Sequence, residues 1–380
     1  MRVGVIGAGL AGTLLAWRIR QMHPPMQVEL VVGAIAAGDA TDASGGLVRG
    51  FEVDPVNREL ATDSLAELYD GGPFAAWTDY QEIGSVYLCA TGVVASLDAV
   101  LARLHQLLPG SVRTVSAAEL EADQGWAGLP AASIAVLERR AGYVSPGRLR
   151  RGVLATLDGL GVRKLAGTVT EITQRRDGVR CSVAGVARHY DVAVVAAGRW
   201  TAGLLARSDL PAAGYRTKAI QYGIYRATGV PPGTFVDETT GLYGRPAPGG
   251  RVLLGLPSDR WDVDPDRPPL DNALQRQVGE VAAIRFPRLR LHALERVVAA
   301  ADAYADPPRL QLRAVPDRSG WLYTFTGGSG GAVKTALAAS RIAAEQLAEH
   351  LAAGPWSGDR AGTDRPIPRP PSSRRERLIL

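Results

Sequence analysis

The sequence opens with MRVGVIGAGLAGTLLA, residues 1–16, and this stretch decides the fold of the first unit. Its apolar run RVGVI is typical of a buried parallel strand. Gly7, Gly9 and Gly12 follow in G-x-G-x-x-G spacing, and a helical pattern comes next. Such glycines make a tight turn, let the backbone approach a pyrophosphate and let helix and strand pack closely, while the helix N-terminus attracts phosphate. The stretch predicts a dinucleotide-binding unit, with a purely structural Gly-rich turn as the alternative.

The chain has 380 residues, which predicts two domains rather than one small core. Its 46% hydrophobic and 21% charged residues are typical of a globular enzyme. No apolar run reaches the roughly 18 residues of a membrane span, and we recognise no signal peptide, so we expect a cytoplasmic protein without a membrane partner. The 2 cysteines and 5 scattered histidines have no metal-ligand spacing, so we expect neither a metal site nor a disulfide framework.

The net charge of +5 is unevenly distributed along the chain. From Trp356 to Leu380 there are 6 Arg against 3 acidic residues, which leaves only +2 for the rest of the chain. This small excess argues against nucleic acid as a partner. The terminal segment 353–380 is rich in Pro and Arg and has no apolar period, so we expect a disordered basic tail.

A second apolar run, Val28 to Val32, predicts the next parallel strand. Dinucleotide-binding folds usually end this strand with an acidic residue that binds the ribose hydroxyls. Here the run is followed by Gly33, and Glu29 lies inside it, so the motif does not identify the ribose-binding group. The turn-rich loop Asp39 to Glu52 follows, and we expect its one basic residue, Arg49, to be at least partly covered by its apolar neighbours.

Three later stretches carry further information. The apolar strand Val192 to Ala196 ends at Ala197-Gly198, a pattern that suits a backbone lying against a cofactor. From Tyr215 to Leu254, aromatic and β-branched residues and the turn PAPGG predict an antiparallel sheet. Trp321 to Leu351 repeats the strand, Gly-rich turn and helix of the opening. Other strands are expected within 85–90, 167–172 and 180–185, and helices within 57–69, 96–108, 116–123, 141–157, 270–283 and 291–298.

Up to about Leu351 the chain resembles the D-amino-acid oxidase/sarcosine oxidase family of flavoproteins. VGVIGAGLAG resembles the family's FAD-binding opening, DVAVVAAGRW its D-x-x-V-V-x-A-G-x-W segment, and TGGSGGAVK its final G-x-S-G-H-G-F-K segment. GYVSPGRL and GLYGRP resemble internal landmarks. The resemblance implies a mixed α/β fold, in which a Rossmann-like FAD-binding domain lies beside a mostly antiparallel substrate domain. The implied FAD-binding segments are 1–84, 142–212 and 314–352, and the implied substrate-binding segments are 85–141 and 213–313.

The resemblance also implies the site residues. In sarcosine-oxidase-like members an Arg and a Lys grip the substrate carboxylate, and the matching residues here are Arg49 and Lys334. Arg245, Tyr243 and Arg313 are further candidates for substrate contact in the substrate-domain half, with hairpin support or core packing as the alternative. FAD would be held by Gly7, Ala8, Gly9, Leu10, Ala11, Gly12, Ser44, Gly45, Gly46, Leu47, Val169, Ala197, Gly198, Trp200, Gly328, Ser329, Gly330, Gly331, Ala332, Val333 and Lys334.

Three departures from the family pattern matter. The family's His in the last motif is Gly331 here, so any role of that imidazole is lost. Sarcosine-oxidase-like members have a Lys that promotes reaction with oxygen, and the matching residue here is Leu253, which puts efficient use of oxygen in doubt. Some members attach FAD through a Cys near the end of the chain, but no Cys follows Cys181, so we expect non-covalent FAD.

The sequence therefore predicts an FAD-dependent oxidoreductase that oxidises the C–N bond of an amino acid or a similar amine. Hydride would pass to the flavin and an imine would form. One alternative is a dehydrogenase that uses an acceptor other than oxygen. Others are a tailoring enzyme for a carrier-bound or RNA-bound amine, and an FAD-binding scaffold without catalysis.

Overall fold

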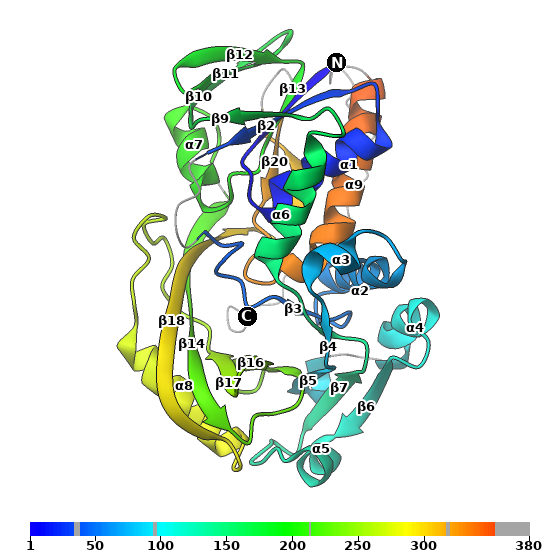
Figure 1. Ribbon diagram of the computed structural model, residues 1–380, viewed down its shortest axis with the longest axis vertical. Helices are drawn as coiled ribbons and strands as arrows, with labels where there is room; N and C mark the ends of the chain where they lie inside the picture. The colour runs from blue at the N-terminus through cyan, green and yellow to red at the C-terminus, as the bar shows by residue number, and fades with distance from the viewer. Residues whose placement is uncertain (34–38, 94–96, 213, 317–319, 354–380) are drawn as a thin grey trace.

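The computed structural model describes residues 1–33, 39–93, 97–212, 214–316 and 320–353. Apart from Ala353, the predicted basic tail lies outside these residues. The described chain confirms a mixed α/β fold with both parallel and antiparallel strands. Figure 1 shows one sheet with its helices in the upper half of the molecule and a second, larger sheet in the lower half.

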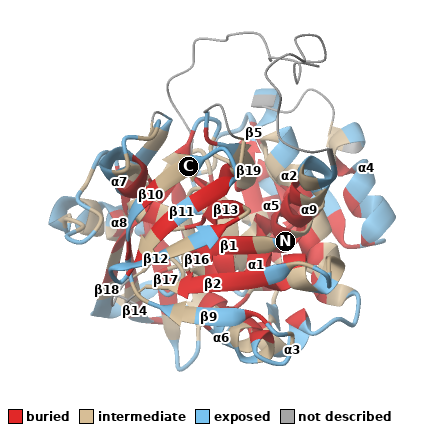
Figure 2. Cartoon of the chain, turned by 90° about the horizontal axis from the view of Figure 1, so that it is seen from above, coloured by how far each residue is buried: buried red, intermediate tan, exposed pale blue. Residues whose placement is uncertain are grey.

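The upper sheet has six strands within the described residues, and all neighbours are parallel except β19 and β20. Their order is β19 (Gln311–Ala314), β20 (Leu322–Thr326), β13 (Val192–Val195), β1 (Arg2–Ile6), β2 (Gln27–Val32) and β9 (Arg163–Ala166). Parallel strands buried on both faces read as continuous apolar runs, which explains why β1, β2 and β13 were identifiable from sequence. Figure 2 shows these three strands as mostly buried.

Alternate residues of the upper sheet enter two different cores. Val3, Val5 and Leu30 pack in one core with α1 (Leu10–Met22) and α9 (Ala332–Ala353). The helices α2 (Pro55–Tyr69), α3 (Phe74–Thr78) and α6 (Pro146–Leu157) belong to the same side. Ile6, Val31 and Val195 point to the opposite side. There they meet α7 (Thr201–Arg207) and the antiparallel strands β10 (Val169–Arg175), β11 (Gly178–Val183) and β12 (Val186–Tyr190).

The lower sheet has eight strands within the described residues, and β15 and β5 are its one parallel pair. The order is β18 (Arg290–Ala305), β14 (Tyr215–Thr228), β17 (Arg251–Gly255), β16 (Leu242–Ala247), β15 (Thr234–Asp237), β5 (Ser85–Ala90), β7 (Ser133–Glu138) and β6 (Val112–Ser116). The predicted hairpin at PAPGG joins β16 to β17. A small sheet of β3 (Leu47–Val48), β8 (Gly142–Tyr143) and β4 (Gln81–Glu82) lies between these parts of the chain.

One predicted helix is wrong. Residues 291–298 belong to the long strand β18, which pairs with β14 along its whole length. The segment is rich in Ala, Leu, Glu and Arg, which are good helix formers, but pairing with the full length of β14 overrides that local preference. Arg313 is also misplaced by the sequence analysis, because it lies on β19 in the upper sheet rather than in the lower sheet.

The two faces of the lower sheet have different roles. The outer face packs Tyr225 and Leu254 against α8 (Asn272–Arg285), which contributes Val278 and Ala282. The inner face carries Tyr222 and a cluster that includes residues of β14, β17 and β18, and it contacts Ala43 of the loop after β2. Because Ala43 follows a strand of the upper sheet and Ile220 of this face lines a cavity with upper-sheet residues, the inner face is turned toward the upper half of the molecule.

Two further α-helices, α4 (Leu97–Leu107) and α5 (Ala117–Gln124), and two short 3-10 turns at Thr91–Val93 and Gly198–Trp200 complete the described chain. The predicted helix within 116–123 is α5, and a capping box begins it, with Ser116 and Glu119 capping each other. Within the described part of the chain, no helix has the length and hydropathy needed to cross a membrane. We propose the domain division given above with its last boundary moved from 313 to about 310, because strands of the upper sheet come from 2–32, 163–195 and 311–326 and those of the lower sheet from 85–138 and 215–305.

Candidate functional site

The strand–turn–helix unit at the N-terminus requires glycine for steric reasons at two positions. Gly7 has a φ of +115°, and a Cβ atom there would lie 2.5 Å from the carbonyl oxygen of Ala196. A Cβ atom on Gly12 would lie 2.0 Å from the carbonyl oxygen of Gly7. Gly9 is different, because a Cβ there would meet only Thr41 Oγ1, at 3.6 Å. The first and third glycines thus allow close packing, and the second leaves the backbone accessible.

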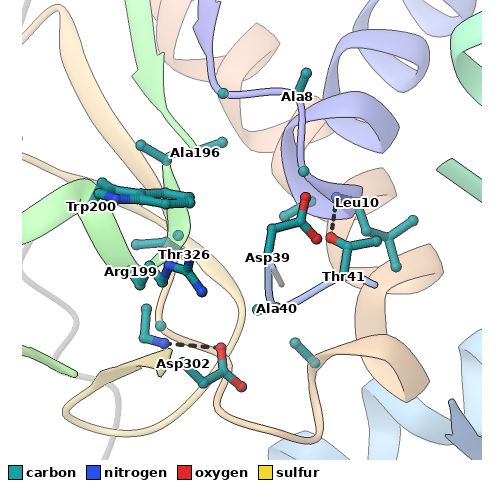
Figure 3. A pocket seen from close by; sticks show the side chains of 18 of the residues that line it. Ala8, Leu10, Asp39, Ala40, Thr41, Ala196, Arg199, Trp200, Asp302 and Thr326 are labelled. Carbon is teal, nitrogen blue, oxygen red and sulfur yellow. Dashed lines mark hydrogen bonds between the residues drawn. The ribbon is translucent and has the colours of Figure 1, made fainter. Parts of the chain in front are cut away.

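A cavity of about 440 Å³ begins at this turn. In Figure 3 the Ala8–Leu10 turn, Asp39 and Thr41 lie on one side of it and Ala196 and Trp200 on the other. Its lining comes from segments that are far apart in sequence. The predicted cofactor residues that line it are Gly7, Ala8, Gly9, Leu10, Ala11, Ser44, Val169, Ala197, Gly198, Trp200, Gly328, Ser329, Gly330, Ala332 and Val333.

The remaining predicted cofactor residues do not line this cavity. Gly12 packs beneath the turn, and Gly45 lies next to Leu253 of the lower sheet. Gly46 approaches the carbonyl oxygen of Val144, while Leu47 pairs with Tyr143 in the small sheet. Gly331 is covered by the side chain of Lys334.

The cavity has the features that a dinucleotide needs. The N-cap of α1 is Gly9, which has no side chain to cap the helix, and the first-turn N–H groups have no partner inside the helix. One of these groups, Leu10 N–H, donates to Thr41 Oγ1 at 3.0 Å. The end of the cavity near Val31, Gly33 and Val169 would accept the adenosine, and the helix N-terminus would hold the pyrophosphate.

The opposite end of the cavity would accept the flavin ring. It is lined by Ile220 and Asp302 from the lower sheet and by Gly328–Gly330 at the start of α9. Backbone at the N-terminus of a helix provides positive potential for the carbonyl edge of a flavin. The residues present therefore fit FAD, and FAD would supply the capacity to accept a hydride.

Three acidic side chains that line this cavity, those of Asp39, Asp266 and Asp302, were not identified from sequence. Asp39 forms an ion pair with Arg150 from α6, so it is held in place by a buried guanidinium. Burial raises the pKa of Asp302 to about 6, although the backbone N–H of Ala303 and the charge of Arg199 both oppose the shift. No local motif marks Asp302, because its position depends on the pairing of β18 with β14.

Arg49 and Lys334 come together, as the resemblance implies, but they meet at a carboxylate of the chain itself. Glu52 Oε1 lies 2.5 Å from Arg49 Nη2 and 2.9 Å from Lys334 Nζ. Arg49 is 5% exposed, its Nε donates to the carbonyl oxygen of Phe51, and its guanidinium lies 4.7 Å from the ring centroid of Tyr87. Burial lowers the pKa of Lys334, and the charge of Glu52 opposes that effect. Sequence reasoning included Glu52 in the loop and did not single it out.

Two further carboxyl groups surround this pair of cations. Glu138 accepts hydrogen bonds from the backbone N–H groups of Gly50 and Phe51, at 2.8 and 2.9 Å. Glu238 accepts a hydrogen bond from the Tyr87 hydroxyl group. Burial raises the pKa of both carboxyl groups. We call Arg49, Glu52, Lys334, Glu138 and Glu238 the charged cluster.

Tyr243 and Arg245 lie two residues apart on β16 and belong to the inner face. The Tyr243 hydroxyl donates to the carbonyl oxygen of Gln221 at 3.3 Å. The hydroxyl also packs over Gly255, where a Cβ atom would lie 2.4 Å from it. Arg245 Nε donates to the carbonyl oxygen of Gly45 at 2.7 Å. Its guanidinium also lies 4.0 Å from the ring centroid of Tyr143, so Arg245 joins the lower sheet to the segments above it.

Glu29, the acidic residue of the second strand, is buried inside the upper sheet. It forms ion pairs with Arg2 and Arg163 and accepts a hydrogen bond from the Tyr190 hydroxyl at 3.1 Å. These contacts use both of its oxygens. Cys89 and Cys181 are buried strand residues.

The upper sheet is mostly parallel, its first strand is followed by a Gly-rich turn, and residues of the second sheet line part of the cavity beside that turn. These features are typical of dinucleotide-dependent oxidoreductases. A family model described as "FAD dependent oxidoreductase" matches residues 2–346. The chain belongs to this family and is an FAD-dependent oxidoreductase. No curated protein sequence gives a significant match.

Solved structures share the fold. NikD, described as an unusual amino acid oxidase essential for nikkomycin biosynthesis, is 20% identical to this chain with a TM-score of 0.67, and the match covers 91% of this chain and 93% of the NikD chain. Glycine oxidase from Geobacillus kaustophilus is 18% identical with a TM-score of 0.68, covering 92% and 95%. L-proline dehydrogenase from P. horikoshii is 15% identical with a TM-score of 0.68, covering 92% and 93%. At these identities the likeness concerns the fold.

Proposed function

We propose that the protein oxidises the C–N bond of an amino acid or an amino-acid-like amine, so that an imine forms as hydride passes to FAD. The observation that carries this proposal is the position of the lower sheet. Its inner face carries Tyr222, Tyr243 and Arg245, and Ile220, which packs in the same cluster as the two tyrosines, lines the cofactor cavity. The similar structures of an amino acid oxidase, a glycine oxidase and an L-proline dehydrogenase agree with this chemistry.

In this proposal the protein's side chains bind and orient the substrate. Arg245 and the pair Arg49–Lys334 are the cations available to a substrate carboxylate, and charge-assisted contacts to either would be strong in a closed site. Tyr243 and Tyr222 would contact the rest of the substrate and exclude water. No protein base is assigned, because hydride can leave from the carbon next to a neutral amine. FAD would be bound non-covalently, since no Cys follows Cys181.

An anaerobic absorbance titration tests this function. The purified yellow protein is mixed with a panel of amino acids and N-methyl amines, and loss of the flavin absorbance is followed. Bleaching by one class of amine supports the proposal and identifies the class. Retained flavin that no amine bleaches would contradict the proposal for free amines and favour an FAD-binding scaffold without this activity.

A second candidate function is a dehydrogenase that passes electrons to an acceptor other than oxygen. It is favoured by Leu253, which occupies the position of the expected oxygen-promoting lysine and is 1% exposed in an apolar cluster with Tyr222 and Ala300. After anaerobic reduction, slow reoxidation by air together with fast reoxidation by a quinone dye would support this candidate. Fast reoxidation by air would instead support an oxidase.

A further inference from the structure

The anion-binding position between Arg49 and Lys334 already holds a carboxylate. Both cations contact the same oxygen, Glu52 Oε1. Their side chains are 6% and 13% exposed and that of Glu52 is 14% exposed, so solvent screens the three charges little. Glu52 therefore makes the contacts that a substrate carboxylate would make there.

This position lies next to the proposed substrate site. Lys334 is in the first turn of α9, directly after Val333, which lines the cofactor cavity. On the lower sheet, Tyr243 pairs with Val236, and Val236 pairs with Tyr87, so Tyr243 and Tyr87 belong to one row of side chains across three strands. The Tyr87 ring covers the Arg49 guanidinium. The Tyr87 ring therefore connects the charged cluster to the row of side chains that includes Tyr243.

The cluster contains more carboxyl groups than cations. Its 2 cations face the 3 carboxyl groups of Glu52, Glu138 and Glu238. Glu138 is held by backbone N–H groups and Glu238 by the Tyr87 hydroxyl, so Glu52 is the carboxylate in direct contact with both cations. An incoming carboxylate would add a fourth acidic group to a desolvated site, which is unfavourable unless Glu52 moves away.

We propose that Glu52 is a specificity-determining residue that competes with carboxylate ligands for the Arg49–Lys334 pair. The protein then discriminates against substrates that must place a carboxylate between these two cations. Arg245 becomes the cation for a substrate carboxylate, because within the described part of the chain its polar contacts are the carbonyl oxygens of Gly45 and Pro246 and it has no acidic partner. The inference rests on the proposed function for the identity of the site, but its binding test needs no turnover.

The test compares carboxylate binding by wild type and Glu52→Gln. The FAD-bound proteins are titrated with acetate and with propionate by calorimetry, at constant pH and in low-chloride buffer. Glu52→Gln keeps the side-chain shape and removes one charge, so we expect tighter binding by at least about tenfold, equivalent to about 1.4 kcal/mol. Glu59→Gln, an equal change at an exposed position of α2, is the matched control and is expected to bind as wild type does.

A double variant shows whether the gain arises from the cation pair. Combining Glu52→Gln with Lys334→Met is expected to remove most of the gain, since one of the two cations is then absent. If the gain persists in the double variant, the carboxylate binds elsewhere and the proposal is wrong. Equal affinities for wild type and Glu52→Gln would also overturn it, because Glu52 would then be a structural counterion only.

Glu52→Asp provides an independent measurement if Glu52→Gln does not fold. The aspartate side chain keeps the negative charge but is one methylene group shorter, which draws the carboxylate back from the two cations. We therefore expect a gain in carboxylate affinity over wild type that is smaller than the gain with Glu52→Gln. No gain with a folded Glu52→Asp protein would contradict the proposal. The outcome is separable from the proposed function, because a protein that no amine bleaches can still show, or fail to show, the change in carboxylate affinity.

Discussion

At the scale of single residues, the glycines of the first turn differ in what they allow. Gly12 lies where α1 touches the turn, and a methyl group there would overlap the carbonyl oxygen of Gly7 at 2.0 Å. We expect Gly12→Ala to destabilise the protein by about 1–3 kcal/mol through overpacking and to weaken FAD binding by displacing the helix N-terminus. Denaturant unfolding and FAD titration measure the two effects.

The control for this substitution is Gly279→Ala in α8. A Cβ atom at Gly279 meets no other atom within 4 Å, and the residue is inside a helix. Alanine there is expected to stabilise the protein by roughly 0.5–1 kcal/mol, because glycine loses more backbone entropy on folding. A Gly12→Ala protein as stable as wild type and with unchanged FAD affinity would refute the steric account of the first turn.

Asp302 gives a pH prediction at the same scale. Burial raises its pKa from 3.8 to about 6, so between these values the folded FAD-free chain retains a proton that the unfolded chain has lost. Stability therefore falls as pH rises from about 4 to about 6 and is lowered by a constant amount above that range. We expect the stability of Asp302→Asn relative to wild type to increase over this window and then level off.

Urea unfolding of both FAD-free proteins at several pH values measures this difference, and titrations common to the two proteins cancel in it. A difference that does not change with pH would show that Asp302 has an ordinary pKa in the fold. Asp302 lines the cofactor cavity, so bound FAD would change the environment of its carboxyl group. The effect of FAD is measured separately, by comparing the same two proteins in the FAD-bound state.

At the scale of elements, α8 is attached to the lower sheet by a buried ion pair. Arg285 Nε lies 2.6 Å from Asp237 Oδ2, and the side chain of Asp237 is fully buried and also accepts hydrogen bonds from Thr239 and Thr240. We expect Asp237→Asn to destabilise the protein by about 3–5 kcal/mol, since it leaves the Arg285 charge buried without a counterion. Thermal and denaturant unfolding measure the loss.

The exposed pair Arg216–Asp262 is the matched control. Its two side chains are 55% and 63% exposed, so Asp262→Asn is expected to change stability little. Similar losses for Asp237→Asn and Asp262→Asn would mean that burial does not govern the effect of these pairs.

Element prediction from sequence succeeded where local signals and tertiary context agree. The capping residues at Ser116 and Glu119 mark the start of α5, and the hairpin turn before Arg251 marks the β16–β17 connection. It failed at 291–298, where the residues prefer a helix but the partner strand β14 provides the hydrogen bonds of a sheet. Strand pairing over such a distance in sequence leaves no local signal.

At the scale of the whole molecule, one cavity collects residues from the first turn, the end of β13, the start of β10 and the start of α9. A ligand that bridges these segments binds the folded chain and not the unfolded one. We expect the melting temperature to rise with FAD concentration, with a stabilisation of about 2.7 kcal/mol at 100 times the Kd. Riboflavin, which lacks the pyrophosphate, is expected to stabilise the protein less. Absence of any shift with FAD would contradict the assignment of the cavity.

The sequence alone determined the mixed α/β class, the family and the strand–turn–helix units, because glycine spacing and apolar runs act over a few residues. It also determined that Arg49 is covered, since its neighbours are apolar. Only the tertiary structure decided that Glu52 lies between Arg49 and Lys334, that Asp302 faces the cavity and that 291–298 is a strand. These features depend on contacts between residues tens to hundreds of positions apart or on a loop geometry that the residue pattern does not encode.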